Sequence, residues 1–223
     1  MKKLSKNILI VVLARKNSRR IKNKNIRKIN GKSLVYITLE FAQKLRLDKI
    51  LVSTDSDKIK KIASNFKKVL IHNRPKKYSG YTSKSLVLIS KIVKWYNNKF
   101  NKKIKGVLLL QPTSPFRNKT IINKAINDFV KNNYRYNYIS VSKTTTSSNL
   151  QMDKKNSILK ISKRLLNFNF MVNGNFYIFN VNKIKKDVKD TIINYKTKGV
   201  VLNSVKDSID IDNYKDLIKA RSL

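Results

Sequence analysis

The sequence contains no cysteine, so the chain can form neither a disulfide framework nor a zinc site built from thiolates. Its one histidine, His72, ends an apolar run, a position that favours a structural or solvated imidazole over a catalytic one. No stretch approaches the roughly 20 apolar residues that a membrane-spanning helix needs. The opening MKKLSKN and the apolar run after it are similar to a signal peptide, but no small-residue cleavage site follows. We therefore expect a cytoplasmic protein with no membrane partner.

Acidic residues are also scarce, because 12 Asp and Glu stand against 51 Lys and Arg, for a formal net charge of +39. Such a field attracts polyanions, so a basic nucleic-acid-binding domain is one alternative. The basic residues are spread along the whole chain rather than gathered in one arm or helix, which favours solvated lysine-rich faces over a nucleic-acid partner. With 41% hydrophobic residues the chain is expected to fold around a core.

Apolar runs of strand length alternate with helix-spaced segments through the first 132 residues. The runs are short and rich in Ile, Val and Leu, as expected of parallel strands covered on both faces. They occupy residues 8–14, 49–53, 68–72 and 106–110, and the helix-spaced segments occupy residues 33–46, 56–65, 83–97 and 118–132. For a chain of 223 residues this order predicts a single α/β domain, with a Rossmann-like three-layer fold and a mostly parallel central sheet.

The alternation ends near residue 133, where a polar, β-rich stretch shows no clear helix. We interpret this stretch as a hairpin that leaves the main body, and we place a protruding segment at about residues 134–170. Strand-like runs return at residues 173–180, 199–203 and 208–212. A closing helix is expected from Asn213.

The loop after the first expected strand, residues 14–25, is unusually cationic. Six of its twelve residues are Lys or Arg, and a hydroxyl and three amides lie between them. Ligands of doubly wound sheets bind at the carboxyl ends of the strands, where such donors can surround a triphosphate. The loop has neither the glycines of a Walker loop nor those of a dinucleotide-binding fingerprint. Charge alone leaves two readings open, a phosphate site and a basic surface loop.

Two carboxylates, Asp210 and Asp212, stand two residues apart on the expected strand at 208–212. Side chains at this spacing face the same side of a strand, so both carboxylates can hold one magnesium ion. The alternative is a polar strand end that caps the last helix.

The loop at residues 14–25 is similar to the A-R-x-G-S-K-R-I-x-x-K-N motif of the acylneuraminate cytidylyltransferases, the CMP-sialic acid synthetases. Further motifs of that family follow in the same order. They are Ser53-Thr54-Asp55-Ser56, Arg74-Pro75, Gln111-Pro112-Thr113-Ser114-Pro115-Phe116-Arg117, Asn173-Gly174 with Tyr177, and Asp210-Ile211-Asp212 with Asp216-Leu217. The chain therefore resembles the family from residue 8 to about 218.

The resemblance implies a nucleotidyltransferase fold and a magnesium-dependent enzyme that joins CTP to a sialic-type acidic sugar and releases pyrophosphate. Catalytic roles would fall to Arg15, Lys24 and Asp212, and magnesium to Asp210 and Asp212. The residues carried over for the nucleotide are Arg15, Ser18, Arg19, Lys24, Asn25 and Arg74. Those carried over for the sugar are Gln111, Asn173 and Tyr177. The resemblance also implies a homodimer in which the protruding segment grips the neighbouring subunit.

Each sugar residue also has a structural reading. Gln111 can simply end a strand, Asn173 can form a turn with Gly174, and Tyr177 can belong to the core. Asp55 can cap a helix or bind a ligand.

The chain departs from the family pattern at several positions. Lys16 and Asn17 stand where the first loop normally has glycine, which predicts a changed loop path because lysine disfavours a left-handed backbone. The family's glutamate and His-Pro pair are missing at 140–152, and its Arg-Gln-Asp run is missing near 163–164. The departures at 140–152 and 163–164 lie where the family binds its sugar and forms its dimer. Pseudaminic, legionaminic and 3-deoxyoctulosonic acids therefore stay open as alternative substrates.

Overall fold

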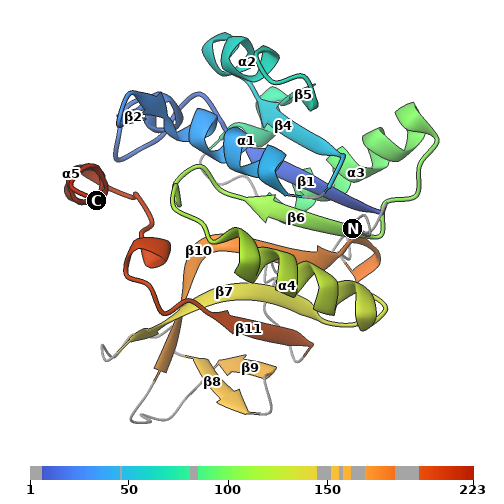
Figure 1. Cartoon of the computed structure of the whole chain (residues 1–223). Coiled ribbons are helices and arrows are strands. Elements are labelled where there is room, and N and C mark those ends of the chain that lie inside the picture. Colours follow the sequence, from blue (N-terminus) through green and yellow to red (C-terminus); the bar gives the residue numbers. More distant parts are fainter. Residues whose placement is uncertain are drawn as a thin grey trace.

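A computed structural model of the chain is built around a nine-stranded sheet with helices on both faces (Figure 1). The strand order is β5-β4-β1-β6-β10-β7-β11-β9-β8. The residues that the structure describes are 7–45, 47–80, 85–144, 152–155, 158–161, 169–183 and 196–223. The side chains of residues 152–155, 158–161, 169 and 183 are outside this description.

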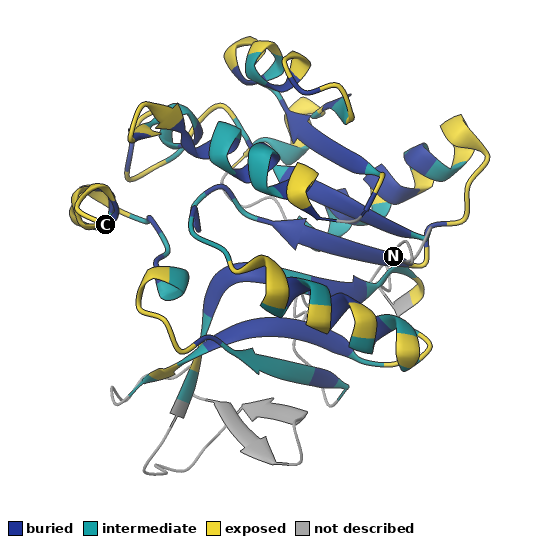
Figure 2. Cartoon of the chain, in the orientation of Figure 1, coloured by how far each residue is buried: buried dark blue, intermediate teal, exposed yellow. Residues whose placement is uncertain are grey.

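Four parallel strands form the first half of the sheet. They are β1 (Ile8–Leu13), β4 (Ile50–Thr54), β5 (Val69–Asn73) and β6 (Gly106–Leu110). β1 lies between β4 and β6, and its residues from Ile8 to Val12 are at most 1% exposed, because both faces are covered (Figure 2). The sequence predicted all four strands, and the mostly parallel sheet is confirmed.

The second half of the sheet contains β7 (Asn137–Thr144), β10 (Asn169–Asn180) and β11 (Thr197–Val201). β10 runs antiparallel to both β6 and β7, and β11 is parallel to β7. Beyond β11 lies an antiparallel pair, β8 (Met152–Lys155) and β9 (Ile158–Ile161), which is drawn below the main body in Figure 1. The segment expected to protrude at 134–170 therefore begins with β7, a buried strand of the main sheet.

Helices cover both faces of the sheet. α1 (Leu34–Lys44), α2 (Asp57–Ser64) and α4 (Lys119–Lys131) share one apolar cluster, and α3 (Ser85–Phe100) packs against the opposite face. The expected helix starts agree with the caps, because the side chains of Ser33 and Asn118 accept hydrogen bonds from first-turn N–H groups. α5 (Tyr214–Arg221) closes the chain behind a capping box formed by Asn213 and Asp216. Within the described residues, no helix is long and apolar enough to cross a membrane.

Short elements surround the first loop. They are the 3-10 helix η1 (Lys24–Ile26) and the hairpin of β2 (Lys28–Ile29) and β3 (Lys32–Ser33). Further 3-10 turns are η2 (Lys76–Tyr78), η3 (Val181–Lys183) and η4 (Lys206–Ser208).

The strand predicted at 208–212 is wrong. η4 takes up its first residue, and the remainder is an irregular segment whose Ile211 N–H donates to Thr113 O at 2.8 Å. The predicted alternation nevertheless holds, because Ile209 and Ile211 are 7% and 0% exposed, whereas Asp210 and Asp212 are only partly buried. The two aspartates therefore project away from the apolar cluster that holds the isoleucines.

Candidate active site

The cationic loop at residues 14–25 leaves the carboxyl end of β1 and is fastened to the neighbouring strand end. Ala14 N–H donates to Ser53 O at 3.0 Å, and Lys16 N–H donates to the carboxylate of Asp55 at 2.6 Å. Within the loop, the amide of Asn25 donates to Arg15 O at 2.8 Å. Neither Lys16 nor Asn17 adopts a positive φ, so replacing the family's glycines costs no backbone strain here.

Asp55 therefore positions the loop rather than capping a helix, because Ser56 is the N-cap residue of α2. His72 is also structural. It is 8% exposed, it shares a hydrogen bond of 3.0 Å with Ser53 Oγ, and burial lowers its pKa.

The loop meets the C-terminal carboxylates through Lys24. Its Nζ donates to Ile211 O at 2.7 Å and to Asp212 Oδ1 at 3.2 Å. The other carboxylate oxygen of Asp212, Oδ2, lies 2.7 Å from Arg20 Nη1. Two cations of the first loop therefore hold a carboxylate that is 188 residues from Lys24 in the sequence.

The two aspartates differ in electrostatic environment. Burial raises the pKa of Asp210, and the charge of Asp212 raises it further, although hydrogen bonds from Thr113 and Ser114 and the charge of Lys24 act in the opposite direction. Burial alone would also raise the pKa of Asp212, but Lys24 and Arg20 outweigh it and lower the pKa. In the folded protein the ionised form of Asp212 is therefore stabilised, whereas the ionised form of Asp210 is destabilised.

Gln111, Ser114 and Asp210 converge on Gly174, whose φ is +74°. A Cβ added there would lie 3.2 Å from Gln111 Oε1 and 3.3 Å from both Asp210 Oδ2 and Ser114 Oγ. Gly174 lies in a β-bulge of β10, between the register positions Val172 and Tyr177. The bulge thus brings the predicted sugar-site amide of Gln111 beside the predicted metal ligand Asp210.

The other predicted sugar residues lie on β10 but are more enclosed. Asn173 is 5% exposed, and its amide donates to Ser142 Oγ at 2.7 Å on β7. Tyr177 is partly buried, and burial together with the charge of Asp210 raises its pKa to about 12. We call Gln111, Ser114 and Asp210 the polar cluster around Gly174. Of the three sugar candidates, only Gln111 therefore belongs to this cluster.

Besides Lys24 and Asn25, the predicted nucleotide residues divide into two groups. Ser18 and Arg19 lie in the cationic loop, Arg19 being exposed and Ser18 partly exposed. Arg15 and Arg74 are engaged with the backbone, Arg15 donating to Gly80 O at 3.0 Å and Arg74 donating twice to Tyr78 O, at 2.9 and 2.7 Å. Burial lowers the pKa of Arg74, and the charge of Arg15 lowers it further, although the charge of Asp55 opposes both.

Sequence reasoning assigned no role to Arg20, Ser114, Arg117 or Asn175. Arg20 is part of the cationic loop, and Ser114 and Arg117 belong to the recognised motif around Gln111, so the motif itself was the available signal. Asn175 had none, because its importance depends on contacts with distant segments.

The donor set suits magnesium. Within the described part of the chain, no three His, Cys, Asp or Glu side chains gather as a complete metal cage. Magnesium commonly binds one or two protein carboxylates together with substrate phosphates and water. Asp210 and Asp212 can provide the carboxylates. A divalent cation bound there would stabilise the ionised form of Asp210, which burial disfavours.

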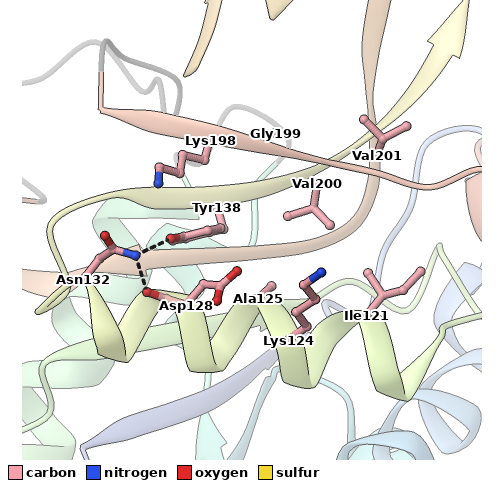
Figure 3. A pocket seen from close by; sticks show the side chains of 10 residues that line it. All are labelled: Ile121, Lys124, Ala125, Asp128, Asn132, Tyr138, Lys198, Gly199, Val200 and Val201. Atoms are coloured by element: carbon pink, nitrogen blue, oxygen red, sulfur yellow. Dashed lines mark hydrogen bonds between the residues drawn. The ribbon is translucent and has the colours of Figure 1, made fainter. Parts of the chain in front are cut away.

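A cavity of about 570 Å³ lies elsewhere, between α4 and β11 (Figure 3). Lys124 and Asp128 of α4 and Lys198 of β11 are among its lining residues, and Asn132 donates hydrogen bonds to Tyr138 Oη and Asp128 O there. None of its lining residues belongs to the polar cluster around Gly174. The size of this cavity therefore does not identify the reaction site.

Solved structures of similar fold cover nearly the whole chain. A solved CMP:2-keto-3-deoxy-manno-octonic acid synthetase in complex with CTP has a TM-score of 0.71 over 96% of this chain and 97% of that chain, at 13% identity. A cytidylyltransferase from Leptospira borgpetersenii has a TM-score of 0.63 over 97% of this chain and 85% of that chain, at 16% identity. These likenesses and the sheet topology define an α/β nucleotidyltransferase fold.

Sequence comparison gives the family. The cytidylyltransferase family model matches residues 9–202, and the chain belongs to that family of nucleotidyltransferases. A CMP-N,N'-diacetyllegionaminic acid synthase from Legionella pneumophila is 29% identical over 214 residues, 92% of this chain and 90% of that protein. An N-acylneuraminate cytidylyltransferase from Escherichia coli is 31% identical over 120 residues, 53% of this chain and 27% of that protein.

Proposed function

We propose that this enzyme transfers CMP from CTP to the anomeric hydroxyl of a nonulosonic, sialic-type acid. The observation that carries the proposal is the contact of Lys24 with Ile211 O and Asp212 Oδ1, which joins a cationic loop to a pair of carboxylates. The cationic loop can balance the charge of a triphosphate, and the two aspartates can bind a metal ion. The contact through Lys24 therefore brings together the groups that the triphosphate and the metal need.

In this reaction the anomeric oxygen forms a bond to the α-phosphorus of CTP. The bond from that phosphorus to the bridging oxygen breaks, pyrophosphate leaves, and the hydroxyl loses its proton. Magnesium, held by Asp210 and Asp212, would neutralise developing negative charge on the reacting oxygens. Lys24 and Arg15 balance charge on the triphosphate, Ser18, Arg19, Asn25 and Arg74 hold the nucleotide, and Gln111, Asn173 and Tyr177 face the sugar.

The acid belongs to the nonulosonic class in this proposal because the Legionella relative, which matches nearly the whole chain, is named for a legionaminic acid. That relationship makes a legionaminic-type acid a specific second candidate alongside a neuraminic acid. Since the nucleotide donor is CTP, we place the reaction in the cytoplasm.

The test is a substrate panel with the wild-type protein. Pyrophosphate release is measured with CTP, UTP, ATP or GTP, and with neuraminic, legionaminic, pseudaminic or 3-deoxyoctulosonic acid, in magnesium or in chelator. We expect release with CTP and one nonulosonic acid only, with a CMP-sugar detected by mass spectrometry. Release that is indifferent to the acid, or absent with every acid, contradicts the proposal.

A further inference from the structure

Arg117 lies behind the predicted sugar residues and links three elements. Its Nε donates to Asn175 O at 3.1 Å on β10, its Nη2 donates to Gln111 O after β6, and its Nη1 donates to Thr38 Oγ1 at 3.4 Å on α1. The two stronger contacts therefore go to the two segments that carry Gln111 and Asn173.

Asn175 on β10 in turn binds the segment that carries Arg117. Its side chain is 1% exposed and donates to Phe116 O and to Asp207 O, both at 2.7 Å. Its own N–H donates to Asn173 Oδ1 at 3.2 Å. Arg117 and Asn175 thus bind each other's segments reciprocally, and Asn175 also fixes the turn that leads into Asp210.

Such an arrangement is stiff for a physical reason. A guanidinium fork donates in fixed directions, so two carbonyl acceptors define the distance between their segments more tightly than one flexible ammonium would. The amide of Asn175 has two N–H donors, and both are used in a buried position. Losing Arg117 would remove a donor from Asn175 O, and losing Asn175 would remove donors from Phe116 O and Asp207 O, whereas Gln111 O would keep the N–H of Ser114. Either loss would free the bulge at Gly174 to move.

We infer that Arg117 and Asn175 form a polar clamp that positions Gln111 and Asn173, and so sets the affinity of the enzyme for its acidic sugar. The inference rests on the proposed function, because the sugar is the ligand that this clamp serves. The nucleotide half is fastened separately, through Asp55 and Lys24. Loss of the clamp should therefore act on one substrate and leave the other nearly unchanged.

The test compares Arg117→Lys and Arg117→Gln with wild type and with Thr38→Val. Thr38→Val removes the longest of the three Arg117 contacts, together with the hydrogen bond that Thr38 Oγ1 donates to Leu34 O within α1, and keeps the two contacts that hold the sugar segments. Steady-state kinetics give kcat and the KM values for CTP and for the acid, CTP binding is measured by calorimetry, and thermal unfolding reports the fold.

We expect Arg117→Lys to raise the KM for the acid at least about tenfold, because a small misplacement of a positioning group has effects of that order. The KM and Kd for CTP should stay within about twofold, and Thr38→Val should stay close to wild type in both.

Three kinetic results would overturn the inference. One is an equal change in both KM values, another is no change in either, and a third is an acid KM for Thr38→Val that matches Arg117→Lys. Unfolding of both Arg117 variants at the assay temperature also counts against it, because Arg117 would then serve folding rather than positioning. If wild type itself fails to use any acid, the proposed function has failed instead.

Discussion

The two aspartates of the active site make opposite contributions to folding. Asp210 is a partly buried carboxylate whose desolvation raises its pKa, whereas Asp212 has a lowered pKa because Lys24 and Arg20 contact it. A group whose charge is costly in the folded state destabilises the fold when it ionises, and a group whose charge is paired does the reverse. This difference is the one expected if Asp210 is kept for the proposed chemistry and Asp212 also stabilises the structure.

We predict that Asp210→Asn raises the free energy of unfolding by about 1 kcal/mol at neutral pH without metal, as relief of active-site strain commonly does. Asp212→Asn should lower it by about 0.5 kcal/mol, since its ion pairs are half-exposed and screened. Both values come from denaturant unfolding of the metal-free protein in chelator. Changes of the same sign in the two variants would refute this assignment of charges.

The pH dependence follows with a definite sign. The cost of Asp210 is absent below its unfolded pKa and appears as pH rises through its raised folded pKa, so the advantage of Asp210→Asn should shrink toward about pH 4. The contribution of Asp212 is present above its unfolded pKa and is lost as pH falls through its lowered folded pKa. The deficit of Asp212→Asn should therefore persist to lower pH. Unfolding curves at matched pH values measure both trends against wild type.

Motifs in the sequence located the residues that meet at this site, including Lys24, Asp212 and Gln111. They gave no role to Arg117 or Asn175. The role of these two residues depends on hydrogen bonds to backbone carbonyl groups that lie near them only in the folded chain. The loss of glycine at Lys16 and Asn17 predicts a changed loop path, and neither residue has a positive φ, as expected of residue types that disfavour a left-handed backbone. The changed path itself stays a prediction.

At the scale of elements, the bulge in β10 is the feature that joins the sheet to the site. Its Gly174 has φ +74° and lies among Gln111, Ser114 and Asp210. We predict that Gly174→Ala lowers the free energy of unfolding by about 1–2 kcal/mol and lowers kcat/KM for the acid at least about tenfold, because the new methyl group pushes on these side chains.

Gly31→Ala is the matched control for the bulge. Gly31 has a similar φ of +76°, but an added Cβ meets nothing within 4 Å. This variant should show a comparable backbone penalty of about 1 kcal/mol with activity near wild type. Stability is measured by thermal unfolding and activity by pyrophosphate release. If the two variants lose activity equally, strain alone explains the effect and the crowding at Gly174 is unimportant.

Element-level prediction succeeded where periodicity was strong. The four parallel strands and the caps at Ser33 and Asn118 agree with the sequence pattern. β7 was missed as a sheet strand because its apolar residues are interrupted by polar ones, although Ile139 and Val141 are fully buried. The segment at 208–212 has the alternation of a strand but not its pairing, since a single backbone hydrogen bond to Thr113 replaces a ladder.

At the scale of the whole molecule, the formal net charge of the chain is +39 at pH 7. A positive field raises the local concentration of an anionic substrate, and salt screens it. We predict that the KM for CTP rises about threefold or more between low and high salt, while kcat changes little. A KM independent of salt would show that the field does not act on the nucleotide.

The same charge permits a control against the nucleic-acid alternative. Binding to random double-stranded DNA is measured over the same salt range, with wild type and Asp212→Asn. If the protein is a cytidylyltransferase, we expect it to bind DNA only weakly and in a salt-sensitive way, with or without CTP and magnesium. Tight binding that persists at physiological salt would favour a nucleic-acid function.

We also propose that the enzyme works as a homodimer, with the β8–β9 pair as the contact that protrudes beyond β11. Light scattering during size-exclusion chromatography should give twice the chain mass of 26.0 kDa. A monomer at the concentrations used for the assay would contradict this assembly.

The most direct measurement compares Asp212→Asn with Asp57→Asn for acid-dependent pyrophosphate release from CTP and magnesium. Asp57 is an exposed aspartate paired with Lys60 at the start of α2, so its variant controls for the loss of one negative charge. We predict that Asp57→Asn keeps the wild-type rate and that Asp212→Asn lowers kcat at least about 10²-fold, with the fold intact. Full activity in Asp212→Asn would contradict the assignment of the paired carboxylates and the cationic loop as the site of nucleotidyl transfer.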